Sequence, residues 1–190
     1  MRIKLCGISS QQQANKAIAL GAHALGFVLY GDNGINPEKA REIINNLPPF
    51  ISVVGVFKDQ PYYEIEELIT FLKLHVLQFD GEEDAFFCSK FNLPVIKAIY
   101  SSTTDMFKNF HDYDIAALML HIDETFNEID IKYLLQVKEL DNLIISIDSG
   151  QAQYQSFIDK LNPYAINISG NVPSSLYWKL AERYTSCNYS

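Results

Sequence analysis

The stretch Ser52-Val53-Val54-Gly55-Val56-Phe57 is an apolar run with almost no polar alternation. Strands of this kind have both faces covered, which is typical of a parallel sheet wrapped by helices rather than of an antiparallel sandwich. An amphipathic stretch that begins at Pro61 and continues through Leu74 follows this run, and a second short apolar run, Val76–Phe79, comes next. The local pattern therefore predicts a strand, a helix and a second strand.

The same unit recurs along the chain at a pitch of roughly 20 to 30 residues, as expected of βα units. Strands are expected at Ile3–Cys6, Leu25–Tyr30, Ser52–Phe57, Val76–Phe79, Val95–Ile99, Ala116–Ile122, Leu143–Ile147 and Ala165–Ile168. Helices are expected at Gln11–Leu20, Pro37–Leu47, Pro61–Leu74, Glu82–Phe91, Thr104–Phe110, Ile131–Leu140, Tyr154–Leu161 and Ser174–Tyr184. Ser10 and Asn36 stand where the first two helices need a capping side chain, and Pro37 suits a first helical position.

Eight strands, each followed by a helix, predict an α/β fold of the (β/α)8 TIM barrel type. The chain has 190 residues, which is below the usual lower end of about 200 for that barrel, so the βα loops are expected to be short. An open doubly wound sheet is the alternative, but it commonly has five or six strands and a glycine-rich turn after the first. Here the first strand is followed by Gly7-Ile8-Ser9-Ser10. We expect one barrel domain over residues 1–190.

Composition excludes several classes of function. The formal net charge is −8, a field that repels phosphate backbones, so nucleic acid is not an expected partner. Cys6, Cys88 and Cys187 share no close spacing, which indicates neither a zinc site nor a disulfide framework and favours a reducing, cytoplasmic compartment. No secretory signal pattern opens the chain. Its apolar runs are far shorter than the ~20 residues that cross a bilayer, so no membrane association is expected.

The carboxyl ends of barrel strands form the active site, so the residues there are the site candidates. A thiol at a strand end near helix N-termini, as at Cys6, can ionise and act as a base, although most such cysteines are small buried hydrophobes. Asp123 follows the sixth strand, where loss of solvent would keep its carboxyl protonated as a general acid. His121 lies two residues earlier on the same face and could take that role. Both residues could instead be solvated loop side chains.

Further candidates are a buried cation and two serine-glycine pairs. Lys97 lies within an apolar strand, so its ammonium must reach a carboxylate, for which Asp80 is available, or a ligand. The pairs Ser149-Gly150 and Ser169-Gly170 follow the seventh and eighth strands, where such barrels hold a phosphate on backbone N–H groups, although they are also ordinary turn residues. We expect His23, His75 and His111 to be surface or packing residues, and Cys88 to lie in the core.

Six stretches, in order along roughly the first hundred residues, carry a family resemblance. They are Lys4–Ile8, Ala19–Tyr30, Pro37–Arg41, Val54–Phe57, Leu77–Glu82 and Leu93–Ile99. In these stretches the chain resembles the phosphoribosylanthranilate isomerases of tryptophan biosynthesis. The resemblance thins beyond Tyr100.

The resemblance implies a (β/α)8 barrel that performs an Amadori rearrangement without a cofactor or a metal. It implies that Cys6 is the general base that takes the proton from the sugar carbon next to the aminal carbon. It also implies that Asp123 is the general acid that protonates the ring oxygen, which requires a two-residue shift relative to His121. The expected partner is a small phosphorylated sugar-amine substrate. The sequence does not fix the oligomeric state, and a monomer is slightly favoured.

The chain departs from the family pattern at several strand ends. The loop 31–35 lacks the arginine that grips the substrate in the family, Phe79-Asp80 replaces Leu-His, and residues 124–128 replace a long glycine-rich loop. Asp148 adds a negative charge at the expected phosphate site, and a carboxylate about 4 Å from a phosphate costs around 4 kcal/mol at an effective dielectric of 20. Two hypotheses follow: an isomerase with an altered site, or a non-catalytic barrel that binds another ligand or a protein partner.

Overall fold

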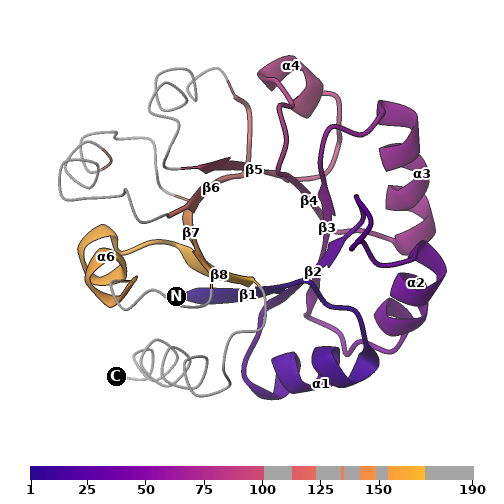
Figure 1. Cartoon of the computed structure of the whole chain (residues 1–190), viewed down its shortest axis with the longest axis horizontal. Helices are drawn as coiled ribbons and strands as arrows, with labels where there is room; N and C mark the ends of the chain where they lie inside the picture. Colours follow the sequence, from indigo (N-terminus) through magenta and orange to yellow (C-terminus); the bar gives the residue numbers. More distant parts are fainter. Residues whose placement is uncertain (101–112, 123–133, 135–141, 149–153, 170–190) are drawn as a thin grey trace.

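The computed structural model describes residues 1–100, 113–122, 134, 142–148 and 154–169. Figure 1 shows its strands as a ring with the described helices outside it. The strands are β1 Arg2–Cys6, β2 Ala24–Val28, β3 Ser52–Phe57, β4 Val76–Phe79, β5 Val95–Tyr100, β6 Ala117–His121, β7 Leu143–Asp148 and β8 Ala165–Ser169. All eight predicted strands are confirmed, with end points that differ from the expected ones by no more than two residues.

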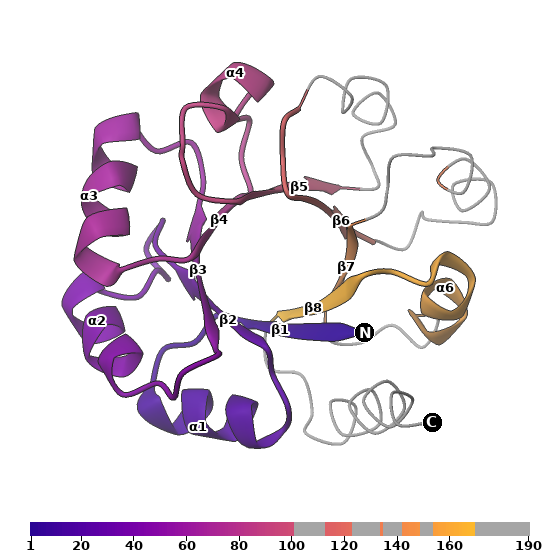
Figure 2. The same ribbon diagram turned by 180° about the vertical axis from the view of Figure 1, so that it is seen from behind.

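The sheet is a closed barrel in which each strand pairs with the next and β8 returns to β1 (Figure 2). Every pairing is parallel. The closing pair aligns Lys4 with Asn167 and Leu5 with Ile168. The predicted (β/α)8 barrel is therefore confirmed, and the open doubly wound sheet is wrong, because an open sheet would leave β1 and β8 as edges.

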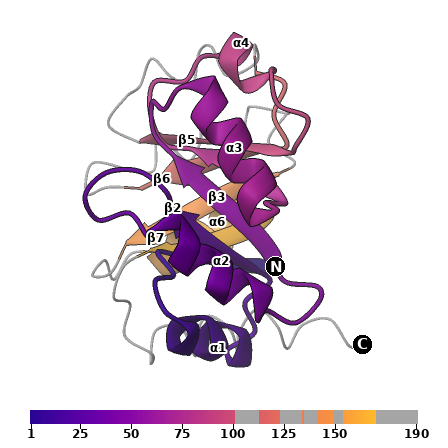
Figure 3. The ribbon, with the colours of Figure 1, turned by 90° about the vertical axis from the view of Figure 1, so that its right-hand side faces the viewer.

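The described helices lie outside the strands, as Figure 3 shows for α1 to α3. They are α1 Gln11–Ala19, α2 Pro37–Asn45, α3 Tyr62–Leu72, α4 Ala85–Cys88 and α6 Tyr154–Leu161. The two predicted caps are confirmed: the side chain of Ser10 accepts from Gln13 N, and that of Asn36 accepts from Glu38 N and Lys39 N. The helices expected at 104–110, 131–140 and 174–184 lie outside the described residues, apart from Leu134.

The helix expected at Glu82–Phe91 is shorter than predicted, because α4 covers only Ala85–Cys88. Asp84 is its N-cap and accepts from Phe87 N at 2.7 Å. The preceding Glu83 is turned toward the strand ends, where its carboxylate accepts from Asp59 N and Gly81 N. The backbone of Asp84 is extended, with φ −78° and ψ 172°, so the helix begins after this cap.

Alternate residues of the strands face opposite sides of the barrel wall. The inner face carries a small apolar cluster made of Ile96, Ala98, Ala117, Met119, Ile144 and Ala165. The outer face packs against the helices, for example where Leu25, Phe27 and Phe57 share a cluster with Ala14, Ala40 and Ile65. Cys88 belongs to this outer core, as predicted, and is 1% exposed. No helix among the described residues is long and apolar enough to cross a membrane.

Two histidines brace the amino-terminal end of the barrel. His23 and His75 each precede a strand, and each Nδ1 accepts from the backbone of a neighbouring strand, from Ile3 N at 3.3 Å and from Val53 N at 3.1 Å. The backbone N–H groups of the same histidines donate back to Ile3 O and Val53 O. An imidazole Nδ1 can accept only while it is unprotonated. Both histidines are surface residues, as expected, and each also joins two neighbouring strands.

We predict that acidification weakens the fold through His23. The pKa of His23 lies below its ordinary value because of desolvation of the ring and then because of the positive charges of Arg2 and the N-terminus. A histidine whose pKa is lower in the folded state than in the unfolded state contributes stability above about pH 6.5, and this stability is lost as the pH falls through the folded pKa. The free energy of unfolding, measured with urea, should therefore decrease from pH 7 to pH 5.

The control is His23→Asn, whose amide oxygen can accept from Ile3 N at every pH. The decrease between pH 7 and pH 5 should be smaller in this variant than in the wild type. An equal decrease in both proteins would show that His23 is not the titrating group.

Candidate active site

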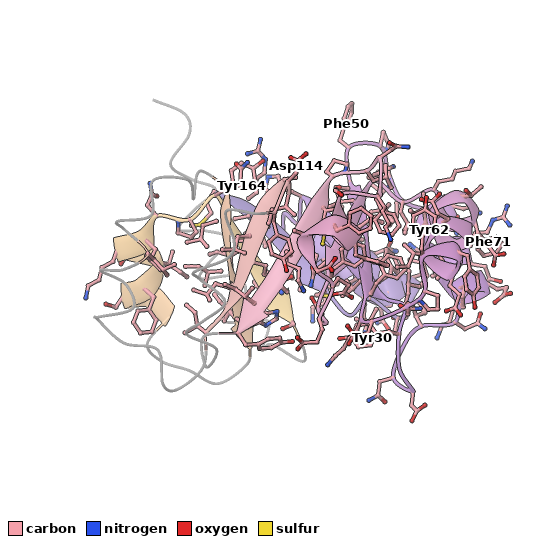
Figure 4. The ribbon with its side chains drawn as sticks, turned by 90° about the horizontal axis from the view of Figure 1, so that it is seen from above. Tyr30, Phe50, Tyr62, Phe71, Asp114 and Tyr164 are labelled. Atoms are coloured by element: carbon pink, nitrogen blue, oxygen red, sulfur yellow. The ribbon has the colours of Figure 1, made fainter. Side chains whose placement is uncertain are left out.

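Polar side chains from several strands meet at the carboxyl-terminal end of the barrel. Figure 4 shows Tyr30 at this end and Phe50, Asp114 and Tyr164, which precede their strands, at the opposite end. All strands run parallel, so their carboxyl ends open at one mouth.

Among the described residues, Cys6, Tyr30, Asp80, Tyr100 and His121 occupy this mouth. Tyr30 interacts electrostatically with Cys6, Asp80 and Tyr100, and the Tyr100 and His121 rings stack with centroids 4.6 Å apart.

Cys6 is the last residue of β1 and has a half-buried, unoxidised thiol. Its Sγ would lie 2.9 Å from a Cβ placed on Gly26 of the paired strand, so any larger residue at position 26 would displace the thiol. The chain turns away directly after Cys6 at Gly7, whose φ of 82° suits a glycine. The predicted position of Cys6 at the carboxyl end of a strand is confirmed, and the structure turns its thiol to the inside of the barrel.

Asp80 has two hydrogen-bond partners in the mouth. Gln78 Nε2 donates to Asp80 Oδ1 at 2.7 Å, and the Tyr30 hydroxyl is hydrogen-bonded to the same carboxylate. Burial, followed by the negative charge of Asp80, raises the pKa of Tyr30 to about 12, so the phenol remains a donor throughout the physiological range. Asp80 was a predicted site residue, whereas Tyr30 and Gln78 were given no role, although each lies within two residues of a strand's carboxyl end.

Lys97 lies on the outer face of the barrel wall and its carboxylate partner is Glu83, so the pairing with Asp80 was wrong. Its Nζ donates to Glu83 Oε2 at 3.2 Å, to Gly81 O at 2.6 Å and to Phe79 O at 3.3 Å. These three acceptors use all three ammonium donors. In the strand register Lys97 lies opposite Phe79, whose side chain packs in the outer core. Asp80 is one position further along and faces the inside of the barrel. The two side chains therefore lie on opposite faces of the wall, and Lys97 is not available to a ligand.

Glu83, which the sequence analysis did not nominate, connects two loops of the mouth. Its two carboxylate oxygens accept from Asp59 N, after β3, and from Gly81 N, after β4. Asp59 in turn accepts from Glu82 N at 2.6 Å. The buried ion pair therefore fixes the backbone directly beside Asp80. Its side chains are 2% and 3% exposed, so each charge depends on the other.

A second buried lysine points into the barrel below Cys6. Lys4 Nζ donates to Asn167 Oδ1 on β8 at 2.8 Å, and Asn167 Nδ2 donates to Ser146 Oγ on β7 at 2.9 Å. All three residues are at most 4% exposed. Strand pairing sets this row, because Lys4 aligns with Asn167, and Asn167 with Ser146. Lys4 was not among the predicted site residues, although it shows the same signal as Lys97, an isolated lysine in an apolar strand.

A cavity of about 560 Å³ opens beside the mouth, between the ends of β2 and β3. Tyr30 lines it together with Leu29, Ile35, Asn36 and Lys58. Lys58 is exposed and is the one cationic side chain among the described lining residues. The cavity thus has an apolar wall, one cationic side chain, Lys58, and one carboxylate, Asp59, whose Oδ1 accepts from Glu82 N.

The remaining candidates are placed only in part. Ser169 is the last residue of β8 and pairs with Asp148 of β7. His121 is the last residue of β6 and pairs with Tyr100 and Ser146. Asp123, Ser149, Gly150 and Gly170 lie outside the described residues, so their roles stay predictions. Within the described residues no group of three or more His, Cys, Asp or Glu side chains is arranged to hold a metal ion.

The sequence pattern of N-(5'-phosphoribosyl)anthranilate isomerases matches residues 3–159 of this chain. The chain belongs to this family. The family resemblance carried by the six stretches is thereby confirmed, and the match extends well beyond them, past Tyr100 and as far as α6.

Individual N-(5'-phosphoribosyl)anthranilate isomerases agree with this assignment. The enzyme of Geobacter metallireducens is 30% identical over 183 residues, which are 92% of this chain and 91% of the relative. The enzyme of Nitrosospira multiformis is 43% identical over 101 residues, which are 52% of this chain and 49% of the relative.

Solved structures of phosphoribosylanthranilate isomerases are similar over nearly the whole chain. The structure from Thermus thermophilus has a TM-score of 0.80 at 32% identity, covering 98% of this chain and 99% of the other. An isomerase in complex with reduced 1-(o-carboxyphenylamino)-1-deoxyribulose 5-phosphate has a TM-score of 0.83 at 27% identity and the same coverage. These relatives favour the catalytic hypothesis over the non-catalytic barrel.

We predict that Lys97→Met strongly destabilises the protein. The substitution leaves the Glu83 carboxylate buried without its cation, and breaking a buried pair in this way costs about 3–5 kcal/mol. The free energy of unfolding from denaturant titration measures the loss. The double variant Lys97→Met/Glu83→Gln should recover part of it, because no buried charge then remains unpaired.

The matched control is Lys39→Met on the exposed surface of α2, where the same change should alter stability by less than about 0.5 kcal/mol. Equal losses in the two single variants would show that Lys97 is not held by a buried pair.

Proposed function

We propose that Cys6 is the general base of the reaction that this chain performs as an N-(5'-phosphoribosyl)anthranilate isomerase of tryptophan biosynthesis. The observation that carries the proposal is the position of the thiol in a member of this family. It lies at the carboxyl end of β1, on the inner face, among the polar side chains of the mouth. In a (β/α)8 barrel this is the end at which catalysis takes place.

The reaction converts an amino-aldose into a 1-amino-ketose. Once the sugar ring is open, the Cys6 thiolate removes the proton from the carbon next to the one that bears the amine. The C–H bond breaks, an S–H bond forms, and the electron pair stays on the substrate as an enolamine, which tautomerises to the ketone. Ring opening needs an acid at the ring oxygen. We assign this role to Asp123 and keep His121, at the end of β6, as the alternative.

The substrate class is a small phosphorylated molecule, as in the complex of the related isomerase with a 5-phosphate product analogue. We place its phosphate at Ser149-Gly150 and Ser169-Gly170. Ser169 supports this placement, because it ends β8 beside the end of β7. Asp80 is held by Tyr30 and Gln78 and faces the mouth, where we assign it to the hydroxyl groups of the sugar rather than to an anionic group.

The aromatic part of the substrate fits the cavity next to Tyr30. Its carboxylate needs a cation, and the loop 31–35 contains none. Lys58, from the end of the neighbouring strand, lines the same cavity. We assign Lys58 to the substrate carboxylate in place of the loop arginine that the family resemblance implies.

Cys6→Ala should abolish most of the turnover. Loss of a positioned general base lowers the rate by about 10²- to 10⁴-fold, and the decay of substrate fluorescence on conversion measures it. The matched control is Cys88→Ala, because Cys88 lies in the outer core away from the mouth. Rescue of a tryptophan auxotroph that lacks this isomerase tests the same variants in cells. Turnover of Cys6→Ala within threefold of wild type would exclude Cys6 as the base.

Lys58→Met should raise KM with little change in kcat, because the carboxylate it binds does not react. Loss of a surface-exposed charge contact of about 1 kcal/mol corresponds to roughly a fivefold rise in KM. Lys39→Met removes a surface charge away from the cavity and should leave KM unchanged. Equal KM values for Lys58→Met and wild type would remove Lys58 from the substrate site.

A further inference from the structure

The ammonium of Lys4 is buried without a counter-ion among the described residues. The residue is 4% exposed, and its partner there is a neutral amide oxygen, Asn167 Oδ1 at 2.8 Å. The other buried lysine, Lys97, has the carboxylate of Glu83 and two carbonyl oxygens. An isolated charge in a protein interior is costly unless an opposite charge lies close to it. An anion on the inner face close to Lys4 would therefore stabilise its charge.

Cys6 is the group in position to supply this anion. Lys4 and Cys6 are two residues apart on β1, so their side chains share the inner face. A Cβ placed on Gly26 would lie 2.9 Å from Cys6 Sγ and 3.0 Å from Lys4 Nζ. Both atoms thus lie within 3.0 Å of one point beside Gly26, and their separation is at most the sum of these two distances.

We propose that Lys4 is the counter-ion of a Cys6 thiolate and, through it, a positioning residue for proton abstraction. The proposal rests on the proposed function in that Cys6 is the base. The thiolate is the form that accepts a proton, and a neighbouring cation favours it. When the thiolate takes the proton from the substrate, the S–H bond forms and Lys4 keeps its charge.

The surroundings hold the Lys4 ammonium in place. Asn167 donates through Nδ2 to Ser146 Oγ at 2.9 Å, which fixes the amide so that Oδ1 faces Lys4. The other titratable groups of the described mouth are Tyr30, Asp80, Tyr100 and His121. Tyr30 remains neutral because its pKa is raised to about 12. Asp80 carries a negative charge, which would disfavour a thiolate, but its carboxylate accepts from Gln78 Nε2. Lys4 is the cation closest along the chain to the thiol.

The pH dependence of Cys6 alkylation by iodoacetamide tests this pair. Mass spectrometry of the Cys6 peptide gives the rate at each pH in wild type, in Lys4→Met and in the control Lys39→Met. We expect the rate in Lys4→Met at pH 7 to fall about tenfold, which is one unit on the pH axis, and the rate at pH 10 to be unchanged. Lys39→Met should follow wild type.

A structural effect of Lys4→Met would change the rate by the same factor at every pH. Such a parallel change, or an unchanged profile, would overturn the proposal. Cys88 is 1% exposed and burial raises the pKa of its thiol to about 11, so its alkylation reports unfolding of the sample.

A second measurement needs no Lys4 variant and applies if Lys4→Met does not fold. The ultraviolet absorbance of thiolate, taken as wild type minus Cys6→Ser, is followed over pH. We expect it to reach half its maximum at least one pH unit below an ordinary cysteine, and a midpoint at the ordinary position would overturn the proposal. Turnover distinguishes the failure of the proposed function from the failure of the role of Lys4. A lowered thiolate midpoint without turnover rejects the proposed function. Turnover that depends on Cys6, together with an ordinary thiolate midpoint, rejects the role of Lys4.

Discussion

The parallel pairing of β8 with β1 is the contact on which the site depends. It closes the sheet, and closure converts eight strand ends into one mouth and eight inner faces into one interior. The register of this pair places Lys4 opposite Asn167. Residues separated by more than 160 positions along the chain thereby share a hydrogen bond of 2.8 Å. Without this pairing, Cys6 would end an edge strand, open to solvent on one side.

Two buried lysines have different environments because they lie on opposite faces of the barrel wall. Lys97 faces outward, where the loop before α4 brings Glu83 to it, and the pair acts as a fixed part of the framework. Lys4 faces inward, where its described partner is an amide. The Lys97 charge is neutralised within the framework by Glu83, whereas the Lys4 charge, whose described partner is neutral, can act on the thiol of Cys6. The difference follows from strand alternation and not from residue type.

Much of the fold could be predicted from the sequence because it rests on local signals. Apolar runs without polar alternation marked the strands, and Ser10 and Asn36 marked the first two helix starts. The helix before Phe91 was predicted too long, because Glu83 has a good helical propensity and its real partners, Asp59 N, Gly81 N and Lys97, lie on other elements. The pairing of Lys97 with Asp80 failed for the same reason. The sequence suggested that the strand-end carboxylate of Asp80 could pair with the buried Lys97, but the two side chains lie on opposite faces of the wall.

By itself the sequence determined the class of the fold, the strand that ends in Cys6 and the family to which the chain belongs, since each of these is written in short contiguous motifs. Tertiary structure alone decided which carboxylate neutralises Lys97, that Tyr30 and Gln78 hold Asp80, and that Lys4 meets the amide of Asn167. These outcomes depend on which side chains meet across the barrel. Such meetings are set by strand register and by the direction in which each residue faces, and a linear pattern does not contain the distances that decide them.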